Sequence, residues 1–152
     1  MGESLPRIEK CFALLTDEEV WLRPNSETVS VGNLVLHLCG NVRQWMIFGL
    51  AGGEDERVRS LEFSERGPLP REELLGRLRQ TVKEAEAVLD RVDRGSLDAP
   101  RRVQGQTETG AGIILHVVEH FSYHTGQITY FVKSRKNIDT GYYAGQDLNV
   151  RG

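Results

Sequence analysis

The sequence is poor in the features that mark secreted, membrane-spanning and nucleic-acid-binding proteins. It has only two cysteines in 152 residues, too few for a disulfide scaffold, so we expect reduced thiols and a cytoplasmic protein. Its apolar runs fall far short of the ~20 residues that cross a bilayer, and its opening, MGESLPRIEK, lacks the apolar core of a signal peptide. The net charge of −3 provides no overall positive field for nucleic acid. We therefore expect neither a membrane nor a nucleic acid as partner.

Strand patterns and the common catalytic motifs are missing as well. No run of residues has a convincing strand pattern, so the fold class is predicted to be all-α. The chain has no phosphate-binding glycine loop, no carboxylate cluster and no Ser-His-Asp arrangement. If the protein is an enzyme, a bound metal with its water or thiol must carry the chemistry. The length suits a single domain over residues 1–152.

Four segments carry apolar residues at the spacing of amphipathic helices. They are residues 5–22 with a break near Thr16, then 31–50, 70–92 and 110–135. Thr16 and Ser30 stand where N-caps are expected, and Pro70 suits the first position of a helix. One apolar face on each helix predicts a four-helix bundle. The long connections 53–69 and 93–107 leave room for crossovers.

All four histidines lie on two of these helices, His37 on the second and the others on the fourth. The spacing of four residues places His116 next to His120, and His120 next to His124, on one helix face. His116 and His124 are separated by about 12 Å of helical rise, so one ion can use 116/120 or 120/124 but not all three. A buried imidazole without a partner costs about 1–3 kcal/mol. Several histidines facing one core therefore favour a shared metal over independent core residues.

The residues around the histidines exclude two common metal centres. A zinc protease of the HExxH type needs a glutamate directly after its first histidine, where this chain has Phe121. A ferritin-like di-iron site needs Glu-x-x-His motifs that the chain lacks. What remains is a mononuclear site with three histidine ligands and open positions. Neutral imidazoles suit Zn²⁺, Ni²⁺, Cu²⁺ or Fe²⁺.

Two stretches at this separation, GNLVLHLCGN at 32–41 and EHFSYHTGQI at 119–128, resemble the DinB-like superfamily of bacterial metalloproteins, in an uncharacterised branch. The resemblance covers roughly residues 10–145. It implies a four-helix bundle with the DinB-like connection order, often assembled as a homodimer. It also implies one divalent ion held by His37, His120 and His124. We expect this ion to be zinc or nickel before other metals.

Other polar residues are expected near this site. The resemblance implies that His116 is not a ligand but lies next to the ligands or lines the cavity. Asn33 and Asn41 lie one turn before and one turn after His37, where either could orient its imidazole or line a cavity. Gln127 is expected either to bond a metal-bound water or to cap a neighbouring helix.

Two further residue types are not assigned to the site. Arg57 and Arg59 are interpreted as surface charge rather than as a cover over the metal. Cys39 follows His37 by two residues and therefore points away from the helix face of His37. It is predicted to be neither ligand nor nucleophile.

The resemblance also bears on function. Some members of the superfamily are transferases or isomerases that use a low-molecular-weight thiol, which implies a metal-dependent thiol transferase or hydrolase acting on small electrophiles. The chemistry is sound, because a metal lowers the pKa of a thiol and the thiolate is the nucleophile. The main alternative is a non-catalytic protein in which the ion pins two helices together or reports metal or stress status. A metal-free interaction domain is the third alternative.

Overall fold

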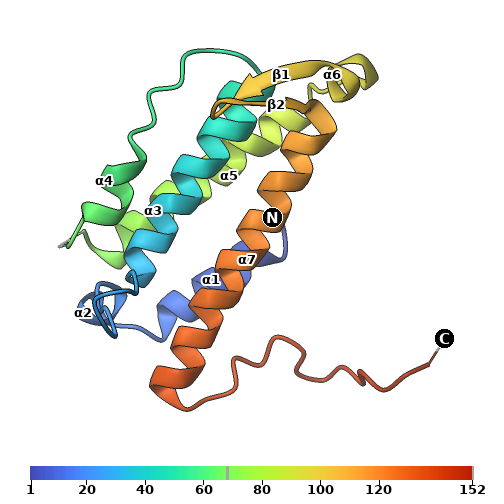
Figure 1. Cartoon of the computed structure of the whole chain (residues 1–152). Coiled ribbons are helices and arrows are strands. Elements are labelled where there is room, and N and C mark those ends of the chain that lie inside the picture. The colour runs from blue at the N-terminus through green and yellow to red at the C-terminus, as the bar shows by residue number, and fades with distance from the viewer. Residues whose placement is uncertain (68, 152) are drawn as a thin grey trace.

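Four long helices that pack against one another form the body of the protein in the computed structural model, which describes residues 1–67 and 69–151 (Figure 1). They are α1 (Ser4–Ala13), α3 (Val31–Val42) with its continuation η1 (Arg43–Leu50), α5 (Arg71–Leu89) and α7 (Gly110–Lys136). α3 packs between α5 and α7, and α1 packs on α7 and α5. The predicted all-α four-helix bundle is confirmed.

Three short helices and one hairpin fill the connections. They are α2 (Asp17–Val20), α4 (Arg59–Ser64), α6 (Arg94–Asp98) and the antiparallel strands β1 (Pro100–Val103) and β2 (Gln106–Thr109). The expectation of a chain without strands was therefore wrong. Each strand has only four, mostly polar residues, and the two-residue turn Gln104–Gly105 has positive φ at both positions, which suits a tight hairpin. The hairpin therefore depends on the conformation of its turn rather than on an alternating hydrophobic pattern in its strands.

Local sequence explains where the helices begin. Thr16 is the N-cap of α2, as expected: it accepts a hydrogen bond from the backbone N–H of Glu19, whose side chain accepts one from the backbone N–H of Thr16, and the two form a capping box. Ser30 caps α3 in the same way, with Asn33 closing the box. The first predicted helix is divided at this point into α1 and α2, because the capping residue starts a new helix.

The second predicted helix, 31–50, changes type along its length. It is α-helical through Val42 and then continues as the π-helix η1. π-helical turns are rare and occur frequently at functional sites. In this chain, η1 places Trp45 in the core, where the indole N–H donates to the Gln104 side chain at 3.0 Å and ties the hairpin to the bundle.

The buried apolar side chains form one cluster that all four long helices share, with members such as Phe12, Leu38, Leu78 and Phe121. Beyond α7 the chain turns back, and the Tyr142 hydroxyl donates to the carbonyl of Arg7 on α1. Within the described residues, no helix combines the length and apolar character needed to cross a membrane.

Candidate metal centre

Three of the four histidines meet between α3 and α7. His37 comes from α3, and His120 and His124 come from successive turns of α7. One ring nitrogen from each lies within 4.8 Å of the others, and the Nε2 atoms of His37 and His120 are 2.9 Å apart. His37 and His124 are buried, and His120 is half-buried. The structure thus brings together the same three residues that the resemblance implied, and leaves His116 one turn away.

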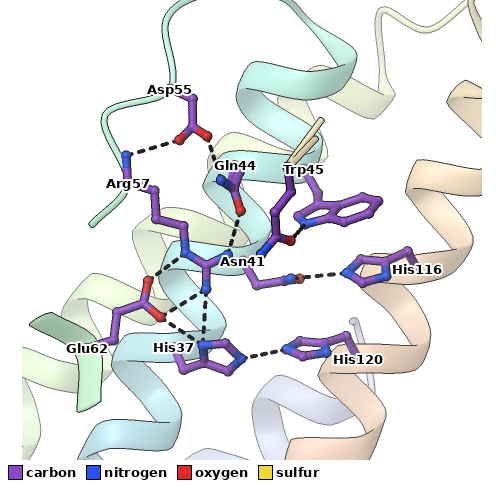
Figure 2. A network of polar contacts seen from close by, with 10 residues as sticks. His37, Asn41, Gln44, Trp45, Asp55, Arg57, Glu62, His116 and His120 are labelled. Atoms are coloured by element: carbon purple, nitrogen blue, oxygen red, sulfur yellow. Dashed lines mark hydrogen bonds and ion pairs between the residues drawn. The ribbon is translucent and has the colours of Figure 1, made fainter. Parts of the chain in front are cut away.

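The outer nitrogen of His37 is held by a carboxylate. Its Nδ1 lies 2.8 Å from Glu62 Oε2, on α4 (Figure 2). Burial raises the pKa of Glu62, but hydrogen bonds from His37 and Arg57 outweigh it and hold that pKa below its ordinary value. An ionised carboxylate only accepts hydrogen bonds, so Nδ1 must carry the proton. The nitrogen facing His120, Nε2, is then left with its lone pair.

Arg57 also lies near this nitrogen, with Nη2 at 3.1 Å from His37 Nδ1. A guanidinium only donates, so it cannot bond to a nitrogen that already carries a proton. Its bonds go to the carboxylate instead, from Nη2 to Glu62 Oε2 at 2.9 Å and from Nε to Oε1 at 2.6 Å. The contacts around Nδ1 therefore agree with the tautomer of His37 that carries its proton on Nδ1.

His124 is held in the same sense by a neutral partner. Its Nδ1 lies 2.7 Å from Gln127 Oε1, and the Gln127 amide N–H donates to the Tyr123 hydroxyl at 3.2 Å. The amide oxygen of Gln127 is therefore the atom that faces the imidazole. His124 therefore also carries its proton on Nδ1 and turns a bare Nε2 inward.

The surroundings of His120 and His124 favour their neutral forms. Burial, followed by the neighbouring His124 and His37, lowers the pKa of His120 to about 4. Burial also lowers the pKa of His124, although the bond to Gln127 opposes the shift. Neutral imidazoles are the form that binds a metal.

The three nitrogens fit a divalent ion in chemistry and in spacing. Two imidazole nitrogens at about 2.1 Å from a tetrahedral zinc ion lie roughly 3.4 Å apart. The separations here run from 2.9 Å to at most 4.8 Å, so small side-chain rotations reach that spacing. Outward hydrogen bonds to a carboxylate and an amide are the usual support of metal-binding histidines.

His116 lies one turn of α7 before the triad. Asn41 donates to its Nε2 at 3.1 Å, and its ring stacks on Trp45 with the centroids 3.6 Å apart (Figure 2). The opposite side of that ring stacks towards His120 at 5.5 Å. The side-chain oxygen of Asn41, Oδ1, is buried and has no hydrogen-bond partner among the residues that the structure describes. His116 and Asn41 thus form a second polar layer above the triad.

Asn33 takes a role that differs from the expected one. It hydrogen bonds to Ser30 and, through its amide N–H, to the backbone carbonyls of Glu62 and Glu65, both at 2.9 Å. It therefore fixes the end of α4 rather than the imidazole of His37. Gln127 contacts the His124 imidazole directly, and its bond to a metal-bound water stays a prediction.

Sequence reasoning missed the Arg57–Glu62 pair. The interpretation of Arg57 as surface charge was wrong, because its side chain is 6% exposed and that of Glu62 is 10% exposed. Arg59 is exposed, as expected, and lies over the Phe63 ring at 4.7 Å. Both members of the pair lie in an irregular connection with a six-residue helix, where no periodicity marks an inward residue. The only signal was two arginines and a glutamate within six residues.

Two grooves adjoin the centre. One, of about 1140 Å³, lies between the start of α3 and the second half of α7, with Tyr123 and Gln127 in its wall. The other, of about 980 Å³, lies on the opposite side of α3, beside Gly40, Arg57 and Glu62. Neither is lined by the triad itself.

Comparison with known proteins agrees with this architecture. Residues 4–142 match the family described as "Protein of unknown function (DUF1572)". A crystal structure of a DinB-like protein from Bacillus cereus ATCC 10987 is similar in fold, with a TM-score of 0.67 and 14% identity over 91% of this chain and 89% of that chain. A conserved protein from Enterococcus faecalis has a TM-score of 0.69 and 16% identity over 89% of this chain and 92% of that chain.

No protein of curated function matches the sequence. The two structural neighbours share the helical bundle with this chain at low sequence identity, so they bear on its fold alone. The family match spans all four long helices and the triad between them. The chain therefore belongs to the DUF1572 family, and its fold is DinB-like.

Proposed function

We propose that the protein binds one divalent metal ion, zinc or nickel before others, through Nε2 of His37, His120 and His124. The observation that carries this proposal is the direction of the outer hydrogen bonds. His37 and His124 donate hydrogen bonds from Nδ1 to Glu62 and Gln127, which leaves both of their Nε2 atoms unprotonated beside His120. Histidines buried only as core residues would not need two unprotonated nitrogens beside a third imidazole.

The metal centre supports an enzyme acting on a small electrophile with a low-molecular-weight thiol. Three histidine ligands leave a four-coordinate ion one position short, and when bound the ion supplies a Lewis acid that lowers the pKa of water or a thiol. Burial raises the pKa of Cys39 to about 11, so this nearby thiol stays protonated and the nucleophile would come from a separate molecule. The groove beside Gln127, walled by Leu34 and Phe131, offers room for an apolar substrate.

A non-catalytic, metal-stabilised protein is the second candidate. The observation that favours it is the burial of His37 and His124, which are 5% and 8% exposed and line neither groove. In that role the ion would join α3 to α7, helices that are far apart in the sequence. This candidate predicts a large loss of stability on chelation and no turnover.

Metal content tests the proposal directly. We expect inductively coupled plasma mass spectrometry to find about one divalent ion per chain in untagged wild-type protein. His37→Ala and His120→Ala should each lose most of it, because two imidazoles hold an ion far more weakly than three.

The same preparations separate the two candidates when incubated with chlorodinitrobenzene and glutathione, cysteine or coenzyme A. Metal-dependent consumption of the electrophile would support the enzyme. Wild type that contains no metal, and takes up neither Zn²⁺ nor Ni²⁺, would overturn the metal site and both candidates with it.

A further inference from the structure

The segment 51–62, which runs from the loop after η1 into α4, supplies the side chains behind His37, although it belongs to neither helix that carries the triad. We infer that Glu62, held in place by Arg57, is a positioning residue that fixes the metal-binding tautomer of His37, so that the metal centre includes residues 51–62. This inference rests on the proposed metal site and deepens it. Its tests have outcomes that separate the two.

The carboxylate of Glu62 is fixed by three hydrogen bonds. Oε2 accepts from His37 at 2.8 Å and from Arg57 Nη2 at 2.9 Å, and Oε1 accepts from Arg57 Nε at 2.6 Å. A two-pronged arginine–carboxylate pair has a narrow geometry, which leaves the plane of the carboxylate little freedom. The oxygen that faces His37 is therefore presented at one position.

Arg57 is fixed in turn by the helix and by its own loop. Its Nη1 donates to Gln44 Oε1, on η1, at 2.7 Å, and Gln44 donates to Asp55 Oδ2 at 2.5 Å. The other oxygen of Asp55 accepts from the backbone N–H of Arg57 at 3.0 Å (Figure 2). Asp55 thus contacts Arg57 in two ways, directly at its backbone N–H and indirectly through Gln44 at its guanidinium.

Burial argues that this network has a task beyond stability. The two charged side chains are almost completely buried, and buried ion pairs give little net stability because removing both charges from water is costly. A role in orienting His37 accounts for their place behind it. The same arrangement supports histidine ligands in many metal sites, where losing the outer partner weakens binding.

Gly40 provides an independent observation. It lies inside α3, one turn after His37, in a helix where alanine would be preferred on propensity. A Cβ atom built on Gly40 would overlap Glu62 Oε1 and crowd Arg57 Nε. The missing side chain therefore makes the space in which the carboxylate sits.

The chain offers a matched control for this position. Gly126 also lies inside a helix of the centre, two residues after His124, but a Cβ there would meet no atom within 4 Å. Gly126→Ala thus adds the same methyl group beside the same triad without touching the Glu62 network.

The first test needs no metal. Long-range ¹H–¹⁵N correlation spectra of the metal-free protein at neutral pH report which nitrogen of each imidazole carries the proton. We expect His37 protonated on Nδ1 in wild type and in Gly126→Ala, and a loss of that single form in Gly40→Ala. A wild-type His37 protonated on Nε2 would overturn the inference even if the protein binds metal.

The second test measures Zn²⁺ affinity by competition with a chromophoric chelator. We expect Glu62→Gln and Gly40→Ala each to bind Zn²⁺ about 10- to 100-fold more weakly than wild type, while Gly126→Ala matches wild type. Because both changes act through one carboxylate, the double variant should lose little more than either single variant. Melting curves of the metal-free variants show that they are folded, and the near-isosteric Glu62→Gln remains informative if Gly40→Ala is not.

The outcomes separate the inference from the proposed function. Wild-type protein that binds no Zn²⁺ overturns the metal site and this inference with it. Wild type that binds tightly, with Glu62→Gln and Gly40→Ala equally tight, overturns the inference alone and leaves the metal site standing.

Discussion

At the scale of single residues, His120 differs from its two partners because no hydrogen bond to its Nδ1 is found among the described residues. Its pKa of about 4, lowered by burial and then by His124 and His37, compares with 6.5 for an ordinary histidine. Between these values the unfolded chain binds a proton that the folded chain does not. The free energy of unfolding therefore falls as the pH drops from about 6.5 towards 4.

Urea unfolding of chelator-treated protein at pH 7 and pH 5 measures this dependence. We expect wild type to lose stability over that interval and His120→Gln to lose less, because glutamine does not titrate. Some slope should remain in the variant, since the pKa of His124 is lowered as well. Equal slopes in both proteins would show that His120 does not contribute.

Single residues also show which parts of the metal centre could be predicted from the sequence. Helical spacing predicted that His120 shares an ion with either His116 or His124, and placed His37 on another apolar helix. The choice of His124 came from the resemblance to the DinB-like superfamily. Glu62 and Arg57 could not be predicted, because tertiary packing alone carries their loop to the back of His37. Asn33 was misassigned for a related reason: its place on α3 suggested the imidazole, while its capping role turns it towards α4.

At the scale of elements, the junction of α6 with α7 depends on one glycine. A Cβ on Gly110, the first residue of α7, would overlap the backbone carbonyl of Ser96. A backbone atom cannot rotate away, so we expect Gly110→Ala to lower the free energy of unfolding by about 1–3 kcal/mol, as overpacking does. Gly76→Ala on α5, where the Cβ meets nothing within 4 Å, should instead be neutral or stabilising by up to about 1 kcal/mol. Chemical denaturation compares the two.

The four long helices and the short α2 were predicted, whereas the hairpin, α4 and α6 were not. The four long helices each carry several turns of apolar spacing, so their patterns outweigh local irregularities. The hairpin has no such pattern, and α4 and α6 are only six and five residues long. The change from α-helix to π-helix inside 31–50 was not predicted either.

At the scale of the whole molecule, association of two copies stays a prediction, and we propose α7 as the contact. Leu115, Val118 and Tyr130 are exposed apolar residues on this helix. Light scattering should give twice the chain mass of 17.1 kDa for wild type. Leu115→Glu should shift the protein towards monomer by placing a charge in the contact, whereas Glu86→Gln, on α5, should not. A wild-type monomer would contradict the proposal.

The π-helix η1 determines how the chain responds to a change of length. A π-helix closes its hydrogen bonds over five residues instead of four, so it holds one residue more per bonded turn than an α-helix does. Deleting Arg43 would let η1 relax into an α-helix, so the residues at the far end of η1 would keep their direction around the helix axis, whereas the same deletion in an α-helix would turn them by about 100°. His37, which precedes the deletion, would keep its place opposite α7, so η1 can lose one residue without moving the triad.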